Sequence, residues 1–183
     1  MNNKLNYLVI HCTATPEARP VSKDDIIKWH TSPVSQGGRG WSRPGYADII
    51  YLDGQLINIV PFNTDDIVDP FEITNGATGM NGTSRHVVYA GGMDHDNKLP
   101  KDTRTKSQSE TLELYVKYTI KRHPDIQILG HNEAPNANGR ACPSFNVAQW
   151  LRAIGIQEKN IYYKGKTLDL ANAKPGCINT DEA

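Results

Sequence analysis

Three side chains in the sequence are of the types that bind zinc. His11 follows a β-rich run that ends at Ile10, His131 follows the apolar run 126–129, and Cys142 comes 11 positions after His131. Imidazoles and thiolates are usual zinc ligands, and three protein ligands leave a fourth tetrahedral position for water, as in catalytic sites. The spacing alone leaves two interpretations open: one shared zinc site, or three unrelated side chains that are separately buried or exposed.

A shared site requires two strands to end side by side. Alternation and β-rich composition predict strands over 4–10, 46–52, 55–60, 86–90 and 126–129. If the first and last of these strands are neighbours in one sheet, their carboxyl ends bring His11 and His131 together. The loop that follows the last strand then carries Cys142 to the same edge.

Capping boxes and turn signals indicate how these strands are connected. The patterns at 22–25 and 107–110 are typical of helix starts, and Asp53-Gly54 is a hairpin signal. Helices are predicted over 23–31, from 107 to 123, and over 145–154. Strands interleaved with helices predict an α/β fold with a single mixed central sheet flanked by helices. The sheet is expected to be mixed because the hairpin pairs its strands antiparallel.

Composition bounds the class of protein. The chain has 183 residues, which suggests one domain, and its 20 Lys+Arg and 20 Asp+Glu give a net charge of zero. Zero charge argues against a nucleic-acid partner, and no apolar run approaches the ~20 residues of a membrane span. Three cysteines make no disulfide framework, and no signal-peptide pattern is present. We expect synthesis in a reducing cytoplasm, with each cysteine a buried thiol or a metal ligand, and a monomeric protein.

Several short strings occur in an order that points to a family. They are IHCTAT (10–15), GY (45–46), DG (53–54), GGMD (91–94), HNE (131–133) and ACPSF (141–145). Together they resemble the zinc-dependent N-acetylmuramoyl-L-alanine amidases of the bacteriophage-lysozyme and peptidoglycan-recognition-protein superfamily, over about residues 5–153. The resemblance implies that His11, His131 and Cys142 hold Zn²⁺ and that Tyr46 is the active-site tyrosine. It also implies hydrolysis of the amide between N-acetylmuramic acid and L-alanine in peptidoglycan or muropeptides.

The chain departs from the family pattern near the ligand cysteine. Many phage members have a catalytic lysine two residues before it, where this chain has Arg140. Arginine stays charged, so Arg140 could stabilise an oxyanion but is a poor general acid, which leaves Tyr46 or water as the proton carrier. Glu133 is a candidate acid/base if it points into the cleft. We favour the alternative, in which it has a structural role or orients a histidine ligand.

Other positions carry open alternatives. Some relatives have a histidine where Gly76 stands, so a cleft-side histidine is expected to be missing. Asp48 alternates with Tyr46 and is expected either near the metal or facing solvent. His86 is expected to pack in the core or lie at the surface. Loop residues Arg39, Trp41 and Arg43 either line a cleft for glycan and stem peptide or belong to an ordinary surface loop in which Trp41 covers the core. Cys12 is expected to be a buried inert thiol, and Cys177 to have no role.

The sequence therefore predicts a zinc amidase domain over 1–155, followed by a C-terminal extension, 156–183, that is partly loose and holds a short strand at 161–163. The absence of a signal peptide is compatible with two settings. One is a phage or prophage endolysin, an antimicrobial cell-wall-degrading enzyme that a separate protein releases to the wall. The other is a cytoplasmic enzyme that recycles muropeptides. The alternative function is a non-catalytic peptidoglycan-binding module of the same fold.

Overall fold

A computed structural model describes residues 3–162 and 172–176. The strands are β1 (Tyr7–Cys12), β2 (Thr15–Pro16), β3 (Asp48–Ile50), β4 (Leu56–Asn58), β5 (Ser84–Tyr89), β6 (Gly92–Met93) and β7 (Gln127–Gly130). The α-helices are α1 (Lys23–Thr31), α2 (Lys106–Arg122) and α3 (Val147–Ala153). Short 3₁₀ helices cover Val34–Gln36, Asn81–Thr83, His131–Glu133 and Glu158–Asn160. None of these helices is long and apolar enough to span a membrane.

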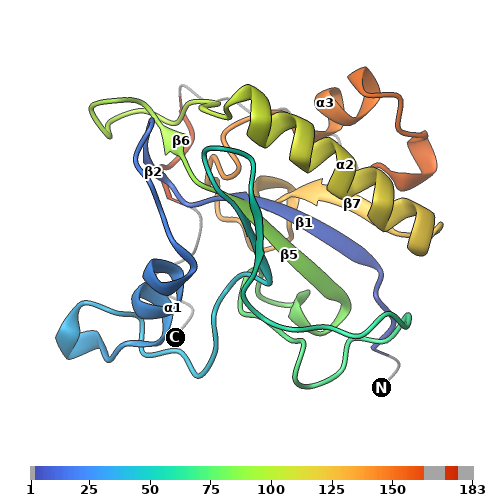
Figure 1. Ribbon diagram of the computed structural model, residues 1–183, viewed down its shortest axis with the longest axis horizontal. Coiled ribbons are helices and arrows are strands. Elements are labelled where there is room, and N and C mark those ends of the chain that lie inside the picture. Colours follow the sequence, from blue (N-terminus) through green and yellow to red (C-terminus); the bar gives the residue numbers. More distant parts are fainter. Residues whose placement is uncertain (1–2, 163–171, 177–183) are drawn as a thin grey trace.

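One five-stranded sheet organises the molecule, in the order β4-β3-β5-β1-β7. Strands β3, β5, β1 and β7 run parallel to one another, and β4 pairs antiparallel with β3 through the turn at Asp53-Gly54. Figure 1 shows α2 and α3 above the sheet and α1 below it. The predicted α/β fold with a mixed central sheet flanked by helices is confirmed.

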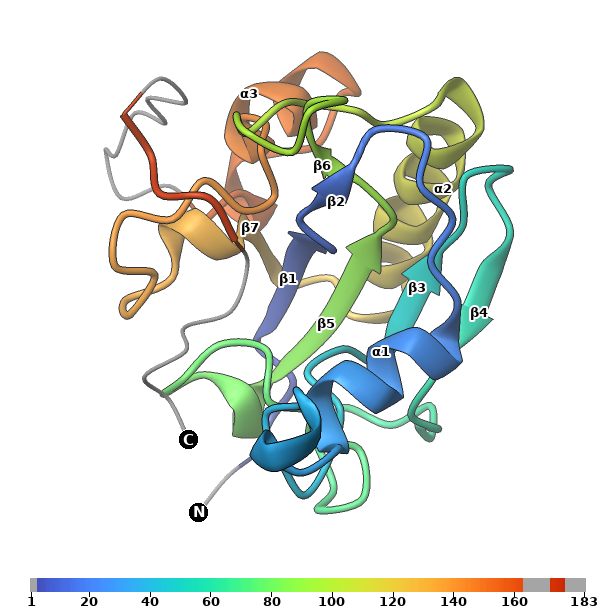
Figure 2. The same ribbon diagram turned by 90° about the vertical axis from the view of Figure 1, so that its left-hand side faces the viewer.

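The position of β1 between β5 and β7 is what brings the two histidines of the predicted site together (Figure 2). In this register Ile10 lies opposite Gly130 of β7, and His11 lies opposite Val88 of β5. Side chains alternate between the faces of a strand. Leu8, Ile10 and Cys12 therefore belong to the core cluster that also contains α2 and α3 residues, and His11 points to the other face.

Capping explains where two of the helices begin. Ser22 and Asp25 form the predicted capping box of α1: the Asp25 N–H donates to Ser22 Oγ at 3.1 Å, and the Ser22 N–H donates to Asp25 Oδ2 at 2.8 Å. The prediction for α2 was two residues too late, because its cap is Thr105 rather than Ser107. In this cap the Gln108 N–H donates to the Thr105 hydroxyl. The buried Gln108 side chain also donates to Ile50 O and Ala90 O. Those two bonds fix the start of α2 on the sheet.

Each boundary of the five predicted sheet strands differs from the structure by one to three residues. β3 and β4 are shorter than predicted, β1 begins at Tyr7 and reaches Cys12, and β5 begins at Ser84. The short strand predicted at 161–163 is a single bridge from Ile161 to Ile128 of β7, with Tyr163 outside the described residues. Periodicity locates an element, but tertiary hydrogen bonds decide its last residues.

Candidate metal centre and cleft

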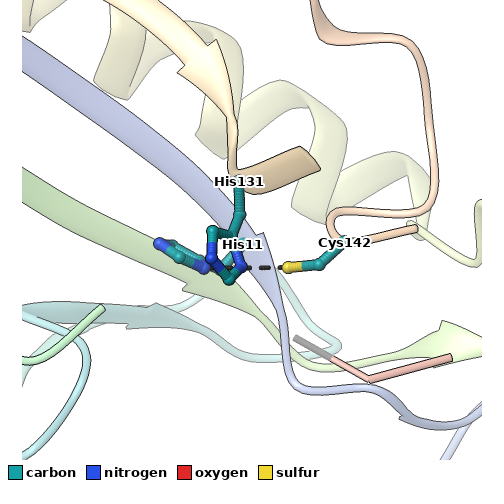
Figure 3. Close-up of side chains that lie close together, drawn as sticks. All are labelled: His11, His131 and Cys142. Carbon is teal, nitrogen blue, oxygen red and sulfur yellow. Dashed lines mark hydrogen bonds between the residues drawn. The ribbon is translucent and has the colours of Figure 1, made fainter. Parts of the chain in front are cut away.

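The structure brings His11, His131 and Cys142 together at the carboxyl edge of β1 and β7. One potential ligand atom from each of the three lies within 4.8 Å of the others (Figure 3). His11 lies in β1, His131 opens the 3₁₀ turn after β7, and Cys142 lies in the loop before α3. Their relative exposures are 0%, 2% and 1%. The three side chains therefore lie in one buried cluster and are not separately placed in the fold.

One distance in this cluster matches the geometry of a zinc site. Zn–N bonds of about 2.0–2.1 Å and a Zn–S bond of about 2.3 Å at tetrahedral angles place nitrogen and sulfur about 3.6 Å apart. His11 Nδ1 lies 3.7 Å from Cys142 Sγ. Burial, and then the neighbouring imidazoles of His131, His86 and His30, lower the pKa of His11 well below its usual value. A neutral imidazole is the form that binds a metal ion.

Cys142 is disulfide-bonded in this structure. This state differs from the expectation that every cysteine is a thiol or a metal ligand. Because zinc binds the thiolate, Cys142 can act as a ligand only after reduction. Cys12 is buried as expected, and burial raises the pKa of its thiol to about 11.

A cavity of about 580 Å³ lies beside the cluster, and Tyr46 connects the two. Its lining includes Thr13, Trp29, His30, Arg39, Tyr46 and Gly176. The Tyr46 ring centroid is 4.9 Å from that of His11 and 5.1 Å from that of His30. Burial raises the pKa of the Tyr46 phenol, which therefore keeps its proton. The Tyr46 ring thus lies between the cluster and the cavity, and its hydroxyl is neutral.

The three loop residues that sequence analysis grouped together have different surroundings. Arg39 lines the cavity, with its guanidinium 5.4 Å from the Trp41 ring centroid. Trp41 is buried and belongs to the core cluster, so it covers the core. Arg43 donates to Pro70 O at 2.7 Å and to Ile73 O at 3.1 Å, and so ties one loop to another. Of these three residues, Arg39 is the one that lines the cavity. The aromatic side chain in the cavity wall is Trp29, not Trp41 as one interpretation expected.

Arg140 lies next to a segment that forms part of the cavity wall. Its Nη1 donates to Pro175 O at 3.2 Å. Lys174 N–H donates to Gly139 O, and Ala141 N–H donates to Lys174 O, each at 2.9 Å. We call residues 172–176 the C-terminal strap. Gly176 of the strap lines the cavity, a role that no pattern in the sequence indicates.

Glu133 supports the turn that carries His131. Its Oε2 accepts a hydrogen bond of 2.8 Å from the Gly130 N–H, and its side chain is buried. Burial raises the pKa of this carboxyl. Among the residues that the structure describes, Glu133 is not part of the cavity lining. The geometry thus places Glu133 as a cap of the 3₁₀ turn.

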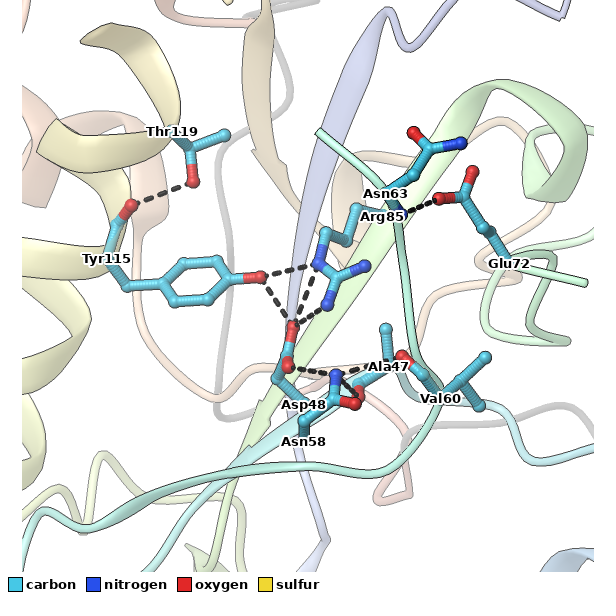
Figure 4. A network of polar contacts seen from close by, with 9 residues as sticks. All are labelled: Ala47, Asp48, Asn58, Val60, Asn63, Glu72, Arg85, Tyr115 and Thr119. Atoms are coloured by element: carbon cyan, nitrogen blue, oxygen red, sulfur yellow. Dashed lines mark hydrogen bonds and ion pairs between the residues drawn. The ribbon is translucent and has the colours of Figure 1, made fainter. Parts of the chain in front are cut away.

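Asp48 has neither of the two expected positions. It is buried in a polar network on the sheet face that carries α2, where its carboxylate accepts from Arg85 at 2.7 Å, from Tyr115 Oη at 2.6 Å and from Asn58 at 2.9 Å (Figure 4). The expectation was wrong because β3 begins only at Asp48. The alternation between Tyr46 and Asp48 therefore does not hold.

Sequence analysis missed a histidine that contacts the cluster. His86 in β5 is completely buried, and its Nδ1 lies 3.0 Å from His11 Nε2. Burial lowers the pKa of His86 to about 3. The signal was present only in the strand register, which places His86 opposite Val9 and on the same sheet face as His11. A single sequence does not show that register.

The comparisons with known proteins agree with what the geometry of the site indicates. A family model described as N-acetylmuramoyl-L-alanine amidase matches residues 1–145. No curated protein sequence matches the chain. Among solved structures, the Ph2119 endolysin from the Thermus scotoductus MAT2119 bacteriophage Ph2119 is similar, with a TM-score of 0.61 and 20% identity, covering 84% of this chain and 86% of that chain.

Two further structures extend the likeness. The amidase LysC from Clostridium intestinale URNW has a TM-score of 0.61 and 18% identity, covering 86% of this chain and 90% of that chain. The ectodomain complex of peptidoglycan recognition proteins LCa and LCx, bound to tracheal cytotoxin, has a TM-score of 0.59 and 15% identity, covering 87% and 85%. At these identities the likeness shows a shared fold.

Proposed function

The chain belongs to the N-acetylmuramoyl-L-alanine amidase family, and on that premise we propose that it is a zinc-dependent hydrolase of peptidoglycan. The bond cleaved is the amide between N-acetylmuramic acid and L-alanine, in the polymer or in muropeptides. The observation that carries this proposal is the cluster of two imidazoles and one sulfur, within 4.8 Å of one another, beside a 580 Å³ cavity.

His11, His131 and Cys142 would hold the zinc ion. With three protein ligands, a bound zinc ion would supply Lewis-acid activation of a water molecule and of the substrate carbonyl. The chain's own residues contribute the geometry: β1 and β7 fix the two imidazoles, and the Gly130–Glu133 hydrogen bond fixes the turn that carries His131. Metal ligands held on a sheet edge in this way are positioned before substrate binds.

Tyr46 is the proposed proton donor and oxyanion partner. Its phenol is protonated and buried, and its ring contacts His11 and lines the cavity. A preorganised hydroxyl at that place can donate to the oxygen on which negative charge develops. Arg140 is the proposed cation beside the site, two residues from Cys142, where its fixed charge favours the same oxyanion.

The cavity wall suits a glycopeptide. The Trp29 ring is suited to stacking on a sugar face, and Arg19 and Arg39 are suited to the carboxylates of a stem peptide. The related complex with tracheal cytotoxin supports a peptidoglycan fragment as the ligand class. The endolysin among the similar structures supports a role in cell-wall lysis after release by a separate protein, and recycling of muropeptides is the second setting.

The decisive experiment combines metal analysis with product analysis. Purified protein in a thiol reductant is expected to contain one zinc and to release stem peptides from a defined muropeptide. Activity is expected to disappear in a chelator and to return with Zn²⁺, and His131→Ala is expected to lose both zinc and activity. Equal zinc in the two proteins would contradict the site. Tight muropeptide binding without turnover would identify the chain as a binding module instead.

A further inference from the structure

His86 and His11 form a pair of buried imidazoles on one face of the sheet. β1 and β5 are parallel, with Val9 opposite His86 and His11 opposite Val88, so the two histidines are diagonal neighbours. His86 Nδ1 lies 3.0 Å from His11 Nε2, while the other ring nitrogen of His11, Nδ1, faces Cys142 Sγ at 3.7 Å. Each ring nitrogen of His11 therefore faces a different partner: Nε2 faces His86, and Nδ1 faces Cys142.

We propose that His86 is a positioning residue for the metal site: it accepts the Nε2–H of His11 and so directs the Nδ1 lone pair of His11 toward His131 and Cys142. This inference rests on the proposed zinc site. A neutral imidazole carries one proton, so a hydrogen bond that holds the proton on one nitrogen leaves the other free to bind metal. Partners of this kind orient a ligand histidine and increase its basicity.

Gly76 explains how the chain accommodates this imidazole. A Cβ at position 76 would lie 2.4 Å from His86 Nδ1 and 2.6 Å from Gly45 O, so any side chain there would displace His86. Sequence analysis expected a cleft histidine to be missing because glycine replaces it at this position. In the structure, the glycine at position 76 leaves room for the imidazole of His86, which β5 supplies.

The test compares two replacements of similar size. In His86→Asn, the amide oxygen lies where Nδ1 was and can still accept from His11, whereas His86→Leu removes the acceptor. We expect zinc affinity, measured by competition with a chelating dye in a thiol reductant, to fall about 10–100-fold in His86→Leu. We expect it to stay within about threefold of the parent in His86→Asn. His95→Leu, a fully solvent-facing histidine, is the control.

A purely structural role would lower the stability of both variants without separating their zinc affinities. A second measurement needs no metal: long-range ¹H–¹⁵N NMR of the metal-free protein reports which His11 nitrogen carries the proton. We expect Nε2 in the parent and in His86→Asn, and a shift toward Nδ1 in His86→Leu.

The outcomes separate this inference from the proposed function. Unchanged zinc affinity in His86→Leu, with affinity lost in His11→Ala, would overturn the role of His86 and leave the metal site intact. If the parent protein binds no zinc, the proposed function fails, and the NMR measurement still decides the hydrogen bond. A His11 proton on Nδ1 in the parent would overturn the inference even if His86→Leu did not fold.

Discussion

Tyr46 illustrates how burial prepares a single residue for a proposed chemical role. Its hydroxyl is shielded from water, and burial raises its pKa, so the neutral phenol persists at pH values near 10, where an exposed tyrosine begins to ionise. A group that keeps its proton in this way can act as a hydrogen-bond donor over the whole working pH range. Arginine at position 140 cannot replace it as a proton donor.

We therefore expect Tyr46→Phe to lower kcat by about 10²–10³-fold, the usual cost of removing one oxyanion donor. The KM for a muropeptide and the zinc content should change little, because the ring contacts with His11 and His30 remain. Steady-state kinetics on a defined muropeptide, with metal analysis of both proteins, checks this. A kcat within threefold of the parent would assign the oxyanion hydrogen bond to another group.

At the scale of the element, helix α1 depends on a cap that can be measured separately from the site. The backbone N–H and then the hydroxyl of Ser22 lower the pKa of Asp25. A carboxyl with a lowered pKa in the folded state adds stability above its unfolded pKa of about 3.9, and this contribution is lost as the pH falls through the folded value.

Ser22→Ala is expected to lower the free energy of unfolding by about 1 kcal/mol at pH 7. Asp25→Asn should also destabilise at pH 7, and its difference from the parent should shrink as the pH falls below about 3.9. Urea denaturation at several pH values measures both. Ser35→Ala, at an exposed position, is the matched control. A constant difference for Asp25→Asn at all pH values would exclude the carboxylate as the cause.

The network of Asp48, Arg85 and Tyr115 joins strands β3 and β5 to helix α2, and breaking it should be costly. Arg85→Met leaves a buried carboxylate without its ion-pair partner and is expected to cost about 3–5 kcal/mol. The double variant Asp48→Asn/Arg85→Met should cost less than the sum of the single changes, because the neutral amide no longer needs the charge. Chemical denaturation of all four proteins gives the coupling, and additive costs would contradict it.

The same elements show what a single sequence can predict. Local patterns predict the hairpin at Asp53-Gly54, the cap of α1 and the strands before His11 and His131. The fold class and the three ligand candidates could therefore be predicted from the sequence. His86, Asp48 and the C-terminal strap were not, because their positions depend on strand register and on contacts between segments far apart in the chain. Local periodicity carries no information on either.

At the scale of the whole molecule, stability measurements can locate the C-terminal boundary of the folded unit. Sequence analysis predicts a domain over 1–155, but Ile161 belongs to the core cluster and the Asn160 side chain donates to Pro124 O and Ile126 O. Tyr162 makes an edge-on ring contact with Tyr7, with centroids 5.6 Å apart. We propose that the folded unit extends at least to residue 162.

A chain that ends at residue 162 should therefore be more stable than one that ends at 155, by about 2–4 kcal/mol. Burial of Ile161 alone contributes about 1.5–3 kcal/mol, and the ordering of the added residues offsets part of the total. Both shortened chains lack the strap, so their difference reports residues 156–162 only. Thermal and urea unfolding measure it, and equal stability would support the shorter boundary.

The bridge between Ile161 and Ile128 has a further consequence for how the protein behaves at high concentration. β7 is the edge strand on its side of the sheet. On its outer side, the Tyr162 N–H donates a hydrogen bond to the Ile128 carbonyl. A strand left uncovered at such a border offers its amides and carbonyls to any other chain. A chain that ends before Ile161 would leave this edge of β7 exposed. At high concentration we expect its copies to associate strand by strand, although each molecule still folds.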